Sequence, residues 1–317
     1  MKSVAVMGLG NFGTALARNW AGAGHDVRGW TVEQEVYDSI RTAGVNEKYL
    51  SDVSLVGMRV SMDIAEAVEG AEIIVLALPS GVVLNVVDDI LPHLTNEQIL
   101  LDLAKGLAPG DQMISDVIAS KLDTAGLSCK LCVMMGPTIA AEVARGVYTS
   151  ALVTSSEVTL AEQVASALST STLKLSAATD SLGSEYWGAF KNVIALACGV
   201  VDGLKQDGRG GDNLKAAVFT AGYREAVKVL PQMGADPETA LSAAGIGDLF
   251  VTATSPHGRN REMGERLGKG QSLAEAEADM VMVSEGVRAA LMFKNLFSGK
   301  GIDAPFVSAV CTLLDEG

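Results

Sequence analysis

The sequence has few of the residues from which metal sites and disulfide scaffolds are built. Its 317 residues include only four cysteines and three histidines, and the histidines are scattered. Cys129 and Cys132 have the spacing of a metal or redox motif, but neither a second such pair nor a histidine cluster accompanies them. Both lie in a predicted strand, where their side chains would point to opposite faces. We therefore expect no metal site, and reduced thiols as in the cytoplasm.

Positive charge is also scarce, with 24 Lys and Arg against 38 Asp and Glu. This balance argues against nucleic acid or an anionic membrane as the main partner, although a few basic groups in one cleft could still bind a small anion. No run of about 18 or more apolar residues occurs, and the N-terminus has no signal-peptide pattern. We therefore expect a cytoplasmic protein without membrane insertion.

The length of the chain is sufficient for two domains. Strand and helix signals alternate up to Ser176, which predicts a mostly parallel sheet wound on both sides. After Ser176 the strand signals stop, and the rest predicts helices separated by glycine turns. We therefore predict an α/β fold, with a Rossmann-type dinucleotide-binding domain over 1–181 and an all-helical substrate domain over 182–317. The predicted strands are Ser3–Met7, Asp26–Trp30, Glu72–Leu78, Ile99–Ala104, Leu131–Met135, Ala151–Thr154 and Leu173–Ser176.

A glycine-rich turn follows the first predicted strand. It is Gly8-Leu9-Gly10-Asn11-Phe12-Gly13, with helical spacing after it and then a second strand. In a dinucleotide site the first glycine permits a tight turn, the second lets the pyrophosphate approach, and the third lets helix pack on strand. The start of the helix then offers free N–H groups to the phosphates. The order of elements predicts a dinucleotide site.

The residues at the end of the second strand should indicate whether the cofactor's ribose carries a 2′-hydroxyl or a 2′-phosphate. An acidic residue there indicates NAD, and a nearby arginine indicates NADP. The sequence continues Trp30-Thr31-Val32-Glu33, with neither type directly at the strand end. Glu33 could bind a ribose hydroxyl or could begin a helix, so NAD and NADP both remain open.

Ligands of such folds bind at the carboxyl ends of the strands. Two features lie at predicted strand ends: Lys105, and the turn Gly136-Pro137-Thr138. A lysine in this place is either a ligand-binding group or a solvated loop residue.

A nearly all-apolar stretch, Tyr186–Val201, opens the second half. Only Lys191 and Asn192 in it carry strongly polar side chains, so the predicted helix should be buried. Burying the ammonium without a partner would cost several kcal/mol, which a ligand or an ion pair could offset. Alternatively, the lysine reaches a nearby surface. Asp248 is a candidate partner, unless it caps a helix.

A second basic cluster, Arg259-Asn260-Arg261, follows a Ser/Pro/Gly turn and starts a predicted helix. An arginine and an amide beside free helix N–H groups would suit a phosphate or carboxylate. The alternative is a solvated basic face.

Together these segments resemble the soluble, nicotinamide-dependent glycerol-3-phosphate dehydrogenase family over nearly the whole chain. The resemblance implies reversible reduction of dihydroxyacetone phosphate to sn-glycerol 3-phosphate by NADH or NADPH, for glycerophospholipid synthesis. It also implies a Rossmann domain followed by a helical domain, usually as a homodimer. The matching segments are Gly8–Gly13, Lys105-Gly106, Gly136–Glu142, Lys191–Ala195, Gly247–Leu249, Gly258–Arg261 and Glu285-Gly286.

The resemblance also implies roles for individual residues. Lys191 matches the proton donor and acceptor, with Lys105 and Asp248 in the same catalytic set. Gly258 stands where many bacterial members have Ser, and its N–H could replace the hydroxyl. Substrate contacts match Lys105, Gly136, Thr138, Lys191, Asn192, Asp248, Thr252, Gly258, Arg259 and Asn260. Cofactor contacts match Gly8, Gly10, Asn11, Phe12, Gly13, Lys105, Ala140, Arg259, Val283 and Glu285.

Two other functions are compatible with parts of this pattern. One is another Rossmann-plus-helical dehydrogenase, acting on a 2-hydroxy acid or on ketopantoate, although the Arg259-Asn260 pair favours a phosphate. The other is a non-catalytic NAD(P)H sensor, which would need the glycine turn but not Lys105, Lys191 and Asp248 together.

Overall fold

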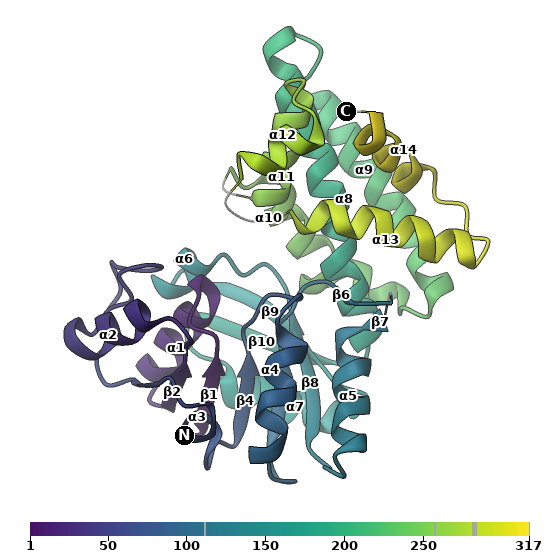
Figure 1. Cartoon of the computed structure of the whole chain (residues 1–317). Coiled ribbons are helices and arrows are strands. Elements are labelled where there is room, and N and C mark those ends of the chain that lie inside the picture. Colours follow the sequence, from purple (N-terminus) through teal and green to yellow (C-terminus); the bar gives the residue numbers. More distant parts are fainter. Residues whose placement is uncertain (111, 257, 281–283, 317) are drawn as a thin grey trace. The chain divides into compact units, whose positions relative to one another are not determined.

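The computed structural model describes residues 1–110, 112–256, 258–280 and 284–316 (Figure 1). The chain separates into two compact units, Met1–Ser181 and Leu182–Gly317. Each unit has its own architecture and is considered by itself.

The first unit is built on an eight-stranded sheet with the order β10-β9-β8-β5-β4-β1-β2-β3. All neighbouring pairs are parallel except β8 and β9, which are antiparallel, so the mostly parallel sheet predicted from the sequence is confirmed. The strands are β1 (Ser3–Met7), β2 (Asp26–Trp30), β3 (Arg59–Ser61), β4 (Ile73–Leu76), β5 (Ile99–Asp102), β8 (Lys130–Met135), β9 (Thr149–Thr154) and β10 (Leu173–Ala178). A small antiparallel pair, β6 (Leu107–Ala108) and β7 (Gln112–Met113), lies outside this sheet.

Helices cover both faces of the sheet, as the alternation of side chains along each strand requires. In β1, Val4 and Val6 belong to one apolar cluster, while Ala5 and Met7 belong to another. The first cluster takes in α1 (Asn11–Gly22), α2 (Gln34–Ala43), α6 (Ala140–Ala144) and α7 (Val158–Leu168). The second takes in α3 (Ile64–Val68), α4 (Val83–Ile90), the short helix η1 (Leu91–His93) and α5 (Ile114–Thr124).

The second unit contains only helices among its described residues, which confirms the predicted all-helical half. Its longer helices are α8 (Ser181–Leu204), α9 (Asp212–Val229), α10 (Asp248–Thr254), α11 (Arg259–Gly268), α12 (Leu273–Ala278), α13 (Glu285–Gly299) and α14 (Pro305–Glu316). Short helical turns connect them: η2 (Lys205–Asp207), η3 (Leu230–Met233), η4 (Pro237–Leu241) and η5 (Ala243–Gly247).

Helix α8 forms the core of the second unit. It is longer than the helix that the apolar stretch Tyr186–Val201 predicted. With its extension to Asp207, it is long and apolar enough to cross a membrane by length and composition, contrary to our expectation of no such segment. However, 83% of its apolar window is buried in the protein. A buried core helix of a soluble protein has the same composition, so the burial explains the apolar sequence.

Candidate active site

The glycine turn has the geometry that a dinucleotide site requires. Gly8 has φ +98°, which only glycine adopts readily, and a Cβ on Gly13 would lie 1.9 Å from the carbonyl oxygen of Gly8. A Cβ on Gly10, in contrast, would meet nothing within 4 Å. The first and third glycines therefore serve the packing of the turn, and the second leaves an open approach. Helix α1 begins directly after it, at Asn11, without a side-chain cap on its N–H groups.

The glycine turn is stabilised by buried hydrogen bonds from Asn46, a residue that the sequence did not single out. The Asn46 Nδ2 group donates to the Leu9 carbonyl at 2.9 Å and to the Thr14 hydroxyl at 2.9 Å. The Thr14 hydroxyl donates to the same carbonyl at 3.0 Å. Both side chains are completely buried. Asn46 lies in an irregular segment without periodicity, so no local pattern indicated this role.

Glu33, just beyond β2, is fixed by two neighbours. The Lys48 ammonium lies 2.5 Å from one carboxylate oxygen of Glu33, and the Tyr49 hydroxyl donates to the other at 2.8 Å. Burial alone would raise the pKa of Glu33, but these two hydrogen bonds lower it overall. Glu33 is therefore a negative charge at the carboxyl end of β2.

The two predicted features at neighbouring strand ends lie together. The Lys105 ammonium donates to the carbonyl of Gly136 at 3.0 Å, and the Thr138 hydroxyl donates to the same oxygen at 3.2 Å. They meet because β5 and β8 are parallel neighbours, whose carboxyl ends share one edge. Ala140 follows shortly after, as the first residue of α6.

In the second unit, Lys191 is buried and paired. Its ammonium lies 2.7 Å from Asp248 Oδ1 and donates to the Thr252 hydroxyl at 2.9 Å. Lys191 is 4% exposed and Asp248 is 2% exposed, so the lysine does not reach the surface. Asp248 is the first residue of α10 and Gly247 is its cap position, so Asp248 is not the helix cap. The attraction of the Asp248 carboxylate offsets part of the free-energy cost of burying the ammonium.

Asn260 joins three helices through its side chain. Its amide nitrogen donates to Asn192 Oδ1 in α8 at 2.8 Å. Its oxygen accepts from the Ser284 hydroxyl and from the Gly286 N–H, both at 2.8 Å, at the start of α13. Asn192 in turn donates to the Gly188 carbonyl at 3.3 Å. Ser284, fully buried, was not among the predicted site residues, because its contact with Asn260 depends on the fold.

The remaining predicted residues of the second unit lie at helix starts. Arg259 is the exposed first residue of α11, and Glu285 is the first residue of α13. Gly258 occupies the cap position of α11, but its N–H donates to the Ser255 carbonyl at 3.3 Å. That N–H is therefore already used within the turn and is not open to replace a serine hydroxyl. Val283 lies outside the described residues.

The cysteines do not form a site in the described part of the chain. All four are free, and no group of three or more His, Cys, Asp or Glu side chains could hold a metal ion there. Burial raises the pKa of the Cys132 thiol to about 12, and the hydrogen bond with Ser155 opposes this only in part. Cys132 is therefore an unreactive core side chain at neutral pH.

A glycine turn on a doubly wound sheet and a helical unit with a buried, carboxylate-paired lysine define a nicotinamide-dependent dehydrogenase of the Rossmann-plus-helical type. Family models that match the N-terminal and C-terminal parts of the chain indicate the same class of protein. The N-terminal model of NAD-dependent glycerol-3-phosphate dehydrogenase matches residues 3–161, and the C-terminal model matches residues 180–317. The chain belongs to this family, as the resemblance implied.

Individual relatives are similar in sequence to this chain over its whole length. A glycerol-3-phosphate dehydrogenase [NAD(P)+] of Exiguobacterium sp. is 36% identical over 100% of this chain and 92% of its own length. The corresponding protein of Macrococcus caseolyticus is 37% identical, over 100% and 95%. The crystal structure of glycerol-3-phosphate dehydrogenase from Coxiella burnetii has a TM-score of 0.89 at 29% identity, over 99% of this chain and 95% of that one. This chain is accordingly an oxidoreductase that uses NAD(P)(H).

Proposed function

We propose that this chain reduces dihydroxyacetone phosphate reversibly to sn-glycerol 3-phosphate with NAD(P)H, and that Lys191 is the proton donor. The observation that carries the proposal is the buried Lys191–Asp248 pair at 2.7 Å. Relatives that match the full length of the chain are named for the same activity. The reaction would supply the backbone of glycerophospholipids.

The chemistry needs one proton and one hydride. The nicotinamide supplies a hydride to the carbonyl carbon of the substrate when it is bound. The electron pair of the C=O bond moves onto oxygen, and the Lys191 ammonium stabilises this charge and donates a proton to it. In the reverse direction, the neutral amine accepts the proton. Asp248 and Thr252 hold the ammonium in place from α10, because both contact its nitrogen.

The substrate phosphate would bind at the start of α11. Arg259 is exposed there, and Asn260 follows it. The first N–H groups of a helix and its positive dipole end favour a phosphate. Binding energy from this non-reacting group can position the carbonyl for hydride transfer.

The first unit would supply most of the dinucleotide contacts, and the second would supply most of the substrate contacts. The glycine turn and the start of α1 suit the pyrophosphate, because Gly10 leaves space and the first N–H groups have no cap. We also assign cofactor or substrate contacts to Asn11, Phe12, Lys105, Gly136, Thr138, Ala140, Asn192, Val283 and Glu285. We further propose a cytoplasmic homodimer.

Initial rates with dihydroxyacetone phosphate, measured with NADH and NADPH separately, test this function. We expect turnover with both and a preference for NADH, because the charged Glu33 would repel the 2′-phosphate of NADPH. Faster turnover of ketopantoate or of a 2-oxo acid in the same assay would favour the other dehydrogenases. Binding of NADH without turnover of any of these substrates would favour a sensor.

A further inference from the structure

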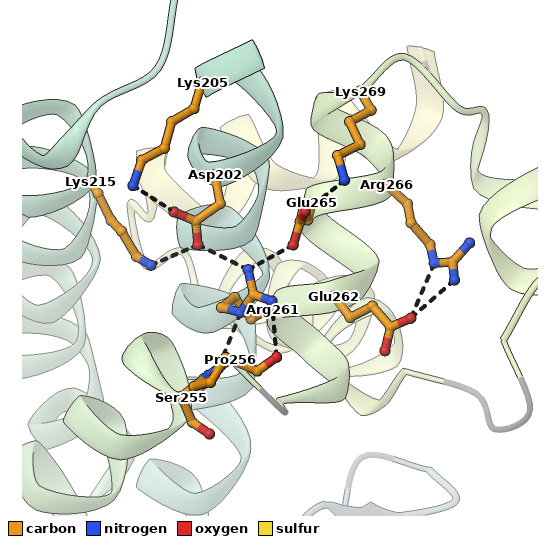
Figure 2. A network of polar contacts seen from close by, with 10 residues as sticks. All are labelled: Asp202, Lys205, Lys215, Ser255, Pro256, Arg261, Glu262, Glu265, Arg266 and Lys269. Atoms are coloured by element: carbon orange, nitrogen blue, oxygen red, sulfur yellow. Dashed lines mark hydrogen bonds and ion pairs between the residues drawn. The ribbon is translucent and has the colours of Figure 1, made fainter.

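Arg261 lies two residues after Arg259, but its guanidinium is hydrogen-bonded to other groups of the protein (Figure 2). Its Nε donates to the Ser255 carbonyl at 3.1 Å, and its Nη2 donates to the Pro256 carbonyl at 3.1 Å. Its Nη1 contacts Asp202 at 3.1 Å and Glu265 at 2.8 Å. A guanidinium has five N–H groups, so these four bonds leave at most one for anything else.

The charge of Arg261 is also balanced locally. Its side chain and that of Asp202 are each only 12% exposed. Asp202 lies in the last turn of α8, and it also pairs with Lys215 at 2.7 Å and with Lys205 at 3.3 Å. Glu265 contacts Arg261 from the next turn of α11. Arg261 is therefore a junction of α8, α11 and the turn before α11, and its geometry is not that of a phosphate ligand.

The backbones of α8 and α11 are in direct contact at the same place. A Cβ on Gly199 would lie 2.0 Å from the carbonyl oxygen of Arg261, and a Cβ on Gly264 would lie 1.9 Å from that of Leu196. These glycines set how closely the two helices approach. Arg261 adds a directional constraint, because its bonds to Asp202 and to two carbonyls fix where α11 begins along α8.

We propose that Arg261 is a positioning residue for the phosphate site. It holds the turn at Ser255 and Pro256 and the first turn of α11 against α8, the helix that carries Lys191. Arg259 and Asn260 thereby keep a fixed position relative to Lys191 within the second unit. The inference rests on the proposed function, since it concerns where the substrate phosphate binds.

The test compares Arg261→Ala with Arg266→Ala as a matched control. Arg266 lies on the same helix and pairs with Glu262 and with Asp279, and within the described part of the chain it shows no bond to α8 or to the turn. For Arg261→Ala we expect the KM for dihydroxyacetone phosphate to rise about tenfold or more, and the NADH dissociation constant to stay within about twofold. For Arg266→Ala we expect both constants to stay near the wild-type values.

Arg261→Lys separates the charge from the bonds to the turn. A lysine can still pair with Asp202, but it cannot reproduce the planar fork that reaches both carbonyls. We expect a KM between those of the wild type and Arg261→Ala, and this variant provides the comparison if Arg261→Ala does not fold. An unchanged KM in the folded variants, with only a lower yield of active enzyme, would show a purely structural role and overturn the inference. An equal rise of KM in Arg266→Ala would also overturn it. Wild-type protein that does not turn over dihydroxyacetone phosphate would instead refute the proposed function.

Discussion

The ammonium nitrogen of Lys191 lies 2.7 Å from a carboxylate oxygen of Asp248, and the two side chains are only 5% and 3% exposed. A buried charge that loses its partner is costly, whereas a buried pair replaced by apolar groups is often tolerated. The stability and the chemistry of this pair can therefore be tested separately.

Replacing Lys191 with alanine should abolish most of the turnover. The proton donor would be missing, and general acid catalysis of this kind contributes about 10²–10⁴ in rate. We expect kcat to fall by that order, while NAD(P)H binding, followed by fluorescence titration, stays near normal. Turnover close to that of the wild type would remove Lys191 from the mechanism.

Replacing both partners should separate folding from catalysis. Lys191→Met leaves the Asp248 carboxylate buried without its ammonium, which should lower the free energy of unfolding by about 3–5 kcal/mol. Adding Asp248→Leu removes that buried charge, so the double variant should regain most of the stability in urea denaturation but no activity. If the double variant is less stable than Lys191→Met, the pair is not what makes the single substitution costly.

Arg259→Ala should chiefly raise the KM for the phosphorylated substrate. A charged hydrogen bond contributes about 1.5–3 kcal/mol, so we expect a rise of about tenfold or more. Arg209→Ala is a suitable control, because Arg209 is exposed and pairs with the nearby Asp207. A KM and a kcat that both remain unchanged in Arg259→Ala would place the phosphate elsewhere.

Asn46→Leu should weaken cofactor binding, because Asn46 stabilises the glycine turn through buried hydrogen bonds. The substitution removes both donors that hold the Leu9 carbonyl and the Thr14 hydroxyl. We expect a higher NADH dissociation constant and a loss of about 1–3 kcal/mol in the free energy of unfolding. Ser39→Ala is the control, since the buried Ser39 hydroxyl donates to the Val36 carbonyl of its own helix. Equal NADH affinities in the two variants would contradict a role in shaping the turn.

Asp202→Asn should have a pH-dependent effect on stability. Burial alone would raise the pKa of Asp202, but hydrogen bonds from Lys215 and Arg261 lower it below its ordinary value. A carboxylate with a lowered folded-state pKa stabilises the protein above the unfolded-state pKa, and this contribution is lost as the pH falls through the folded-state value. We expect the variant to lose about 1–3 kcal/mol in urea denaturation at pH 6–8, and less below about pH 4.

Asp207→Asn provides the comparison for that experiment. The Asp207 side chain is 59% exposed, and in the described part of the second unit its ion pair is with Arg209 alone. Exposed pairs contribute about 0–1 kcal/mol, so its loss should be small at every pH. A pH-independent loss in Asp202→Asn would show that its carboxylate is not responsible for the stabilisation.

The parts of the fold that local patterns encode were predictable. The glycine turn, most strands of the sheet and the buried helix around Lys191 each depend on residues close together in the sequence. The pattern did not predict the direction of β9, the second strand from one edge of the sheet. It runs antiparallel to β8, and apolar alternation is the same for both directions. The strand β3 and the pair β6–β7 are too short, at three and two residues, to show periodicity.

The site was predictable where a residue type was unusual for its surroundings. A lysine in an apolar helix indicated burial, and Asp248 was already a candidate partner, which the ion pair confirms as a contact. The substrate and cofactor roles of the site residues remain predictions. The supporting contacts of Asn46, Ser284 and Arg261 could not be inferred, because they join segments between five and 59 residues apart through ordinary polar side chains.

The composition of α8 also has a consequence for the synthesis of the chain. As the nascent polypeptide emerges, α8 is complete before α9 to α14 exist to cover it, and it has the length and apolarity of a membrane-spanning segment. Lys191 is the eleventh of its 24 residues, close to the middle. A lysine at the centre of a helix raises the free energy of translocon-mediated insertion by about 2.5–3.5 kcal/mol. The same ammonium therefore also disfavours misdirection of the unfinished protein into a bilayer.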